Sequence, residues 1–182
     1  AADLLSQAEH GVDSQVLLVS NKETVVEEVQ KAIAAQLEQL PRKETAQKAL
    51  ENSKAIVLEA TQEALDLINE YAPEHLILAI EHAEVVSEKI LNAGSVFIGH
   101  YSPESVGDYA SGTNHTLPTN GHAKAYSGVS LDSFVKKITF QQLTERGLHN
   151  IAQTVVEMAE AESLAAHANA VKVRVASIQN NK

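Results

Sequence analysis

Short apolar runs alternate with amphipathic helical patterns along the first hundred residues. Four runs of apolar, partly β-branched residues are typical of buried strands, and they lie at residues 15–19, 55–58, 76–80 and 95–98. Between them, apolar residues recur at helical spacing. The predicted helices cover residues 23–40, which Pro41 ends, 42–51, 61–72 with Thr61 as N-cap, and 83–92. This alternation predicts an α/β fold, a mostly parallel sheet with helices on both faces.

The pattern changes after residue 99. Residues 100–128 are dense in Gly, Ser, Thr, Asn, His and Pro, which predicts a shaped functional loop. In residues 131–142 apolar and polar positions alternate, and we expect an extended, hairpin-like segment there. Residues 147–175 predict one long Ala-rich helix with no partner helix of comparable length, so it is expected to pack on another subunit.

These patterns divide the chain near residue 129. We expect an α/β domain with its functional loop over residues 1–129, and an extended segment with a helical tail over residues 130–182 that serves dimerisation. The chain opens inside an amphipathic helix, with Ala1, Leu4 and Leu5 on one stripe. An opening of that kind indicates a fragment or a processed chain.

Charge and composition exclude several classes of protein. The chain has 14 basic and 24 acidic residues, a net charge of -10, and no Lys/Arg cluster that would favour nucleic-acid binding. It has no cysteine, which excludes disulfides and thiolate metal sites. No apolar run reaches the roughly 18 residues that a membrane span needs. We expect a soluble, cytoplasmic protein.

The eight histidines raise the question of metal binding. They form no H-E-x-x-H or H-x-H pattern, so a metal site has to be assembled from distant segments. Gln7 and His10 stand at i and i+3, on one helical face just before Gly11, and can present two ligands together. Without other evidence, however, Gln7 and His10 are more commonly interpreted as ordinary surface residues near a helix end.

Glu74 and His75 form the most suggestive pair. Pro73 ends a helix and leaves both residues at the start of the next strand. A carboxylate beside an imidazole suits proton transfer near neutral pH. The alternative, that Glu74 and His75 are an ordinary solvent-exposed pair in a loop, fits the sequence equally well.

Three further residues are candidates from later segments. Asp108 lies in a glycine-hinged polar loop and could be an oxygen ligand. Glu162 and His167 are five positions apart near the end of the predicted long helix, so both reach one site only if that helix bends. The alternative is that His167 has no role in a site and is an ordinary exposed residue of the helix.

Five sequence blocks together resemble the histidinol dehydrogenase family. They read A-E-H-G-x-D-S-Q, Y-A-P-E-H-L, G-S-V-F-I-G, S-P-E-S-x-G-D-Y-x-S-G-x-N-H-x-L-P-T and A-E-x-L-x-x-H-A-x-A-V. The resemblance runs from Gln7 to about Arg174, and the fourth block is long and highly specific. The family enzyme is more than twice this length, so the resemblance implies that this chain is its C-terminal portion, with an incomplete Rossmann-like sheet.

The resemblance assigns roles position by position. It implies zinc ligation by Gln7, His10, Asp108 and His167. It implies catalysis by Glu74 and His75. The substrate-contacting set it implies is Gln7, His10, Glu74, His75, Asp108, His115, Glu162 and His167.

The implied activity is that of an NAD-dependent alcohol and aldehyde dehydrogenase. L-histidinol is oxidised through L-histidinal to L-histidine, with His75 as general base and Glu74 as the activator of the water that adds to the aldehyde. NAD binding is expected upstream, because no G-x-G-x-x-G occurs here. The resemblance also implies a homodimer in which Glu162 and His167 complete the neighbouring site. The isolated chain is expected to be inactive.

Two other classes of function stay open on the sequence. A zinc hydrolase would use Glu74 to activate a metal-bound water and would need no NAD. A non-catalytic oligomerisation or metal-storage module would keep the fold and tolerate substitution of Glu74 and His75.

Overall fold

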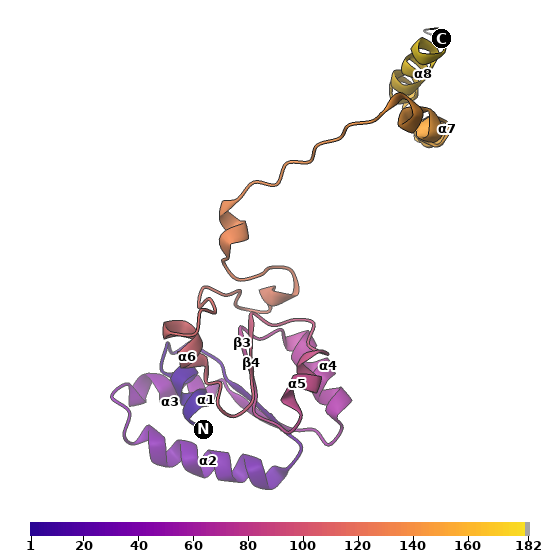
Figure 1. Cartoon of the computed structure of the whole chain (residues 1–182). Helices are drawn as coiled ribbons and strands as arrows, with labels where there is room; N and C mark the ends of the chain where they lie inside the picture. Colours follow the sequence, from indigo (N-terminus) through magenta and orange to yellow (C-terminus); the bar gives the residue numbers. More distant parts are fainter. Residues whose placement is uncertain (181–182) are drawn as a thin grey trace. The chain divides into compact units, whose positions relative to one another are not determined.

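Two parallel strand pairs organise the first part of the chain in the computed structural model, which describes residues 1–180 (Figure 1). Strand β1 (Leu17–Ser20) pairs with β2 (Lys54–Val57), and β3 (His75–Leu78) pairs with β4 (Ser95–Ile98). All four predicted strands form, and the predicted parallel pairing is confirmed. They make two separate two-stranded sheets within the described residues.

The chain divides into two units, Ala1–Val135 and Lys136–Lys182, and each is described by itself. The helices of the first unit are α1 (Ala2–Ala8), α2 (Glu23–Leu37), α3 (Lys43–Glu51), α4 (Thr61–Tyr71), α5 (Ala83–Ser87) and α6 (Glu104–Tyr109). The predicted helices are present, although α5 is shorter than predicted. Thr61 is not the N-cap of α4, because Ala60 holds that position and offers no side-chain acceptor.

Two small apolar clusters hold the first unit together. In one, Ala8 of α1 packs against Ala46 and Ala49 of α3, and all three are fully buried. In the other, Leu76 and Leu78 of β3 pack with Ala83 of α5 and with Ile68 of α4. Since successive strand side chains point to opposite faces, His75 lies on the face of β3 away from this cluster. In Figure 1, α4 and α5 lie to one side of β3 and β4, and α6 lies to the other.

The segment of residues 100–128 is not a continuous loop. It contains α6 and a short 3₁₀ helix, η1 (His122–Lys124). The remainder is tied down by hydrogen bonds, among them Asn114 Nδ2 to the Val129 carbonyl and Val129 N–H to the Thr116 carbonyl. A salt bridge of 2.6 Å joins Lys124 to Glu70 of α4. The prediction of a shaped loop therefore missed the helix that carries Asp108.

The second unit is a helical hairpin, and the prediction of one long helix is wrong. Helices α7 (Glu145–Ala161) and α8 (Ala165–Asn180) are separated by a break at which Ser163 has a φ of 61°. The two helices pack on each other, with Lys172 paired to Glu160 at 2.5 Å. The prediction that the tail has no partner helix is therefore also wrong. An Ala-rich composition favours helix on both sides of the break, and it does not reveal the turn between them.

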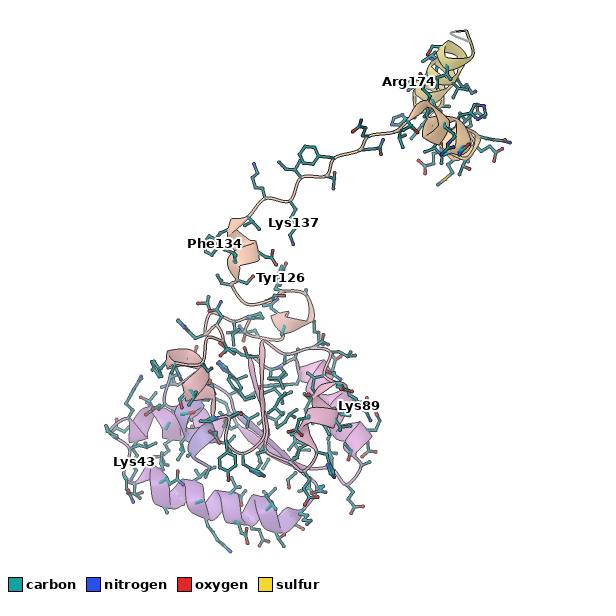
Figure 2. All side chains as sticks on the ribbon, in the orientation of Figure 1. Lys43, Lys89, Tyr126, Phe134, Lys137 and Arg174 are labelled. Carbon is teal, nitrogen blue, oxygen red and sulfur yellow. The ribbon has the colours of Figure 1, made fainter. Side chains whose placement is uncertain are left out.

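The predicted hairpin-like segment is wrong as well. Residues 131–134 form a 3₁₀ helix, η2 (Leu131–Phe134), and within the described chain no strand follows before α7. Its alternating apolar side chains are exposed, among them Phe134 at 78% and Phe140 at 91%. Figure 2 shows Phe134 standing out from the ribbon. None of the helices within residues 1–180 has the length and apolar character needed to cross a membrane.

Candidate active site

The corner between α4 and β3 fixes the backbone of Glu74 and His75. Helix α4 ends at Tyr71, and the buried Ala72 follows in the left-handed region with a φ of 53°. A left-handed backbone costs an alanine about 1–2 kcal/mol, so the surroundings must hold it there. They do so through two hydrogen bonds of 2.9 Å, from Gly94 N–H to the Pro73 carbonyl and from Ser95 N–H to the Glu74 carbonyl.

Gly94 allows this close approach because it lacks a side chain. A Cβ at this position would lie 2.5 Å from the Glu74 carbonyl oxygen and 3.2 Å from Cβ of Leu117. Both neighbours belong to ordered segments, so the backbone of Glu74 would have to move. The start of β4 is therefore built around the position of the Glu74–His75 pair.

We predict that Gly94→Ala lowers the free energy of unfolding by about 1–3 kcal/mol, the usual cost of forced overpacking. Urea unfolding followed by circular dichroism measures it. Gly11→Ala is the matched control, since its new Cβ would meet only the end of the exposed Asp13 side chain. Equal stability of the Gly94→Ala and Gly11→Ala variants would contradict this packing.

Helix α6 brings two carboxylates to His75. Glu104 and Asp108 are four residues apart, which places them on one face of α6. One ligand atom each from His75, Glu104 and Asp108 lies within 4.8 Å of the other two. Glu104 is only 3% exposed, and Ser6 of α1 donates a hydrogen bond of 3.2 Å to its Oε2. Helices α1 and α6 and strand β3 therefore meet at this cluster.

The close fit of α6 to β4 depends on Gly107. A Cβ on Gly107 would lie 2.6 Å from Cε1 of Phe97, so the helix backbone rests against that ring. The Phe97 ring also lies 5.9 Å from the His75 imidazole, centroid to centroid. Phe97 thus gives His75 an apolar neighbour on its side of the strand pair.

The charged groups of this cluster affect the pKa of Glu74. Its burial raises the pKa of the Glu74 carboxyl, while the positive charges of His75 and His10 lower that pKa and the negative charges of Asp108 and Glu104 raise it. His10, Glu74, His75 and Asp108 come from three distant segments. Of these four, the structure places His75 and Asp108 within 4.8 Å of each other, and Glu74 precedes His75 in the chain.

The donor atoms around this cluster fit a metal ion. The side-chain Nε2 of Gln7 is buried without a hydrogen-bond partner among the described residues. An amide is oriented in a structure by its hydrogen bonds, so the oxygen of Gln7 can occupy the same place when a cation is bound. Imidazole, carboxylate and amide groups without thiolates are a donor set that zinc accepts.

The remaining three predicted residues are exposed side chains. His115 is exposed, and no hydrogen bond or ion pair joins it to the others within the described chain. Glu162 and His167 are exposed and belong to the second unit. The break at Ser163 does bend the chain between Glu162 and His167, as a common site for the two residues requires.

Sequence reasoning missed Glu104. Its place four residues before Asp108 was the available signal, but that signal requires a helix over residues 104–109. The segment was predicted to be a loop, in which a spacing of four residues has no directional meaning. Ser6, which donates to Glu104, gave no signal of its own.

Imidazole, carboxylate and amide groups gathered beside a parallel strand pair are the composition of a metal-assisted active site. The profile of the histidinol dehydrogenase family matches residues 1–175 of this chain. The chain therefore belongs to the histidinol dehydrogenase family, as the sequence blocks indicated.

Individual relatives agree with this assignment. The chain is 58% identical over 179 residues to a histidinol dehydrogenase of Bacteroides thetaiotaomicron, covering 98% of this chain and 42% of the relative. It is 55% identical over 178 residues to a histidinol dehydrogenase of Haemophilus influenzae, covering 98% of the chain and 42% of that relative. The crystal structure of histidinol dehydrogenase from Elizabethkingia anophelis superposes with a TM-score of 0.92 at 57% identity, covering 98% of this chain and 41% of that one. The chain thus spans about two fifths of the length of these relatives.

Proposed function

We propose that this chain supplies the metal-binding and acid–base part of a zinc- and NAD-dependent histidinol dehydrogenase. In the proposed reaction L-histidinol is oxidised through L-histidinal to L-histidine, and two NAD are reduced. The observation that carries the proposal is that His75, next to Glu74 in the chain, lies with Asp108 and Glu104 in a group whose ligand atoms are within 4.8 Å of one another. We assign the main NAD-binding domain to the part of the longer relatives that this chain does not match.

His75 and Glu74 have distinct roles in this proposal. Neutral His75 takes the hydroxyl proton of the alcohol as its carbon gives a hydride to NAD, and the aldehyde forms. Glu74 takes a proton from the water that adds to the aldehyde carbon, and His75 gives its proton to the former carbonyl oxygen, so that the hydrate forms and the imidazole is neutral again. His75 then takes a hydroxyl proton of the hydrate as the second hydride leaves, which gives the acid. The partial burial of both residues, with the Phe97 ring beside the His75 imidazole, supports these roles because it limits the access of bulk water.

The proposed ligands of zinc are Gln7, His10, Asp108 and His167. Bound zinc supplies a Lewis-acidic anchor for the amine and imidazole of the substrate. We further assign substrate contacts to His115 and Glu162. The assignment of His167 as a zinc ligand rests on the family resemblance. So do the assignments of His115 and Glu162 as substrate contacts.

A chimera with one of the longer relatives tests the proposed function. Residues of this chain replace the matching region of the Bacteroides thetaiotaomicron relative, and NADH formation from L-histidinol is followed at 340 nm. We expect turnover by the chimera and none by the 182-residue chain alone, since a hydride acceptor site is then absent. A folded, zinc-loaded chimera without turnover contradicts the proposal. Ester or amide hydrolysis without NAD would instead indicate the zinc hydrolase.

Zinc content tests the ligand set separately. We expect His10→Ala and His167→Ala each to weaken zinc binding by at least about tenfold in the chimera, because each removes one ligand. The measurement is competition with a chromophoric chelator followed by elemental analysis. His149→Ala is the control, as His149 is exposed on α7 and belongs to no proposed role. Zinc binding unchanged in both ligand variants rules out this ligand set.

We propose that the working enzyme is a cytoplasmic homodimer in which residues 130–182 reach the neighbouring site. The exposed apolar side chains of the second half support an assembly, since Leu131, Phe134, Ile138 and Phe140 are all more than two thirds exposed. A soluble chain rarely leaves such side chains in water together.

A further inference from the structure

His75 has a hydrogen-bonding position that nothing in the structure fills. Its Nε2 is out of contact with solvent and lacks a partner among the described residues. A buried polar atom without a partner costs about 1–3 kcal/mol, so native structures nearly always provide one. The ring cannot turn freely to find another partner, because it begins β3 and lies against Phe97.

Two carboxylates lie within reach of the imidazole, those of Glu104 and Asp108. They differ in surroundings, because Glu104 is 3% exposed and Asp108 is only partly buried. Glu104 is also anchored, since Ser6 donates to its Oε2 and its Oε1 has no donor in the described part of the chain. Asp108 is assigned to the metal in the proposed function. Glu104 is therefore the carboxylate that remains available to accept a hydrogen bond from the His75 ring.

We propose that Glu104 is a positioning residue that accepts a hydrogen bond from Nε2–H of His75 and so holds the imidazole in one tautomer. One ring nitrogen of His75 lies within 4.8 Å of a Glu104 carboxylate oxygen, so the two groups are neighbours and a modest movement of either brings them to a normal hydrogen-bond length. Catalytic hydrogen bonds are often longer in an empty site than in a reacting one.

The tautomer decides what His75 can do. A proton held on Nε2 leaves Nδ1 with its lone pair, and only a nitrogen with a lone pair can take a proton from the substrate. A buried carboxylate also stabilises the imidazolium that then forms. This inference rests on the proposed role of His75 as general base. The connection through Ser6 makes α1, β3 and α6 one unit around that base.

Nuclear magnetic resonance tests the tautomer without turnover. Long-range proton–nitrogen spectra of the ¹⁵N-histidine-labelled 182-residue chain, without added metal, distinguish Nε2–H from Nδ1–H. His75→Asn identifies the His75 signals among the eight histidines. We expect one Nε2–H tautomer in the wild-type chain. An Nδ1–H or mixed pattern for His75 in the folded wild-type chain overturns the proposal, whatever the variants do.

Two variants of Glu104 separate hydrogen bonding from packing. Glu104→Met fills a similar volume without an acceptor, and we expect mixed tautomers at His75. Glu104→Gln keeps an acceptor oxygen, and we expect the Nε2–H pattern to remain. A folded Glu104→Met chain that keeps the single Nε2–H pattern shows that Glu104 is merely structural.

Kinetics of the chimera complete the test. We expect Glu104→Met to lower kcat by about 10–100-fold, as for other residues that orient a reacting group, with little change in KM for L-histidinol. A rise in KM at unchanged kcat overturns the positioning role. An inactive wild-type chimera that still shows the Glu104-dependent tautomer would count against the proposed function and leave the positioning of His75 in place.

Discussion

His75→Asn in the chimera should abolish both oxidation steps, whereas Glu74→Gln should stop the reaction after the first. The base is needed for each hydride transfer, and loss of a general base usually costs about 10²–10⁴-fold in rate. Glu74 is assigned only to the water that adds to the aldehyde. A rapid-quench experiment at excess enzyme should therefore show L-histidine from wild type, L-histidinal from Glu74→Gln and unchanged L-histidinol from His75→Asn.

The control for this prediction is His82→Asn. His82 is exposed and has a φ of 55°, a backbone conformation that asparagine tolerates well, so its replacement should leave both steps intact. Burial raises the pKa of Glu74, and glutamine keeps the shape of the side chain without the charge. Equal loss of the first step in the Glu74→Gln and His75→Asn variants would refute the division of labour between these neighbours.

Two inactive copies of the chimera should restore activity when they form one dimer. One copy carries His75→Asn and the other carries His167→Ala. If residues 130–182 complete the neighbouring site, one of the two sites of the mixed dimer has neither substitution. Mixed dimers purified through two different affinity tags should then show about half of the wild-type activity.

The matched control pairs His75→Asn with His10→Ala. Both residues belong to the first unit, so every site of that mixed dimer keeps one defect and should stay inactive. No recovery in the His75→Asn and His167→Ala mixture would show that each chain completes its own site. Recovery in the control would show that His10, rather than His167, is the exchanged ligand.

The sequence was sufficient for the strands and for most of the first-unit helices. Runs such as residues 55–58 and 95–98 are short, apolar and β-branched, and their parallel pairing follows from the helices between them. The Glu74–His75 pair was found from Pro73, whose ring cannot continue a helix. Its importance came from the resemblance, because local chemistry alone left a solvated pair equally acceptable.

The turn at Ser163, helix α6 and the role of Glu104 depended on contacts between distant residues, which the hydrophobic pattern along the sequence does not reveal. Ser163 turns the chain with a left-handed φ, yet serine occurs in helices as well as in turns. Helix α6 has only six residues, too few for an apolar period to emerge from a polar segment. Glu104 became visible only once α6 placed it beside His75 and Ser6.

Helix α1 gives the site an unusual dependence on metal supply. It has only seven residues, so it has little stability of its own, yet it carries Gln7, and His10 lies two residues beyond its end. Its anchorage is a contact between alanines on α1 and α3 and the bond from Ser6 to Glu104. A zinc ion held by Gln7 and His10 would add a third anchor, so docking of α1 and zinc binding are thermodynamically linked. Zinc depletion would then loosen the start of the chain before it changed the strands, and the melting temperature would follow zinc concentration.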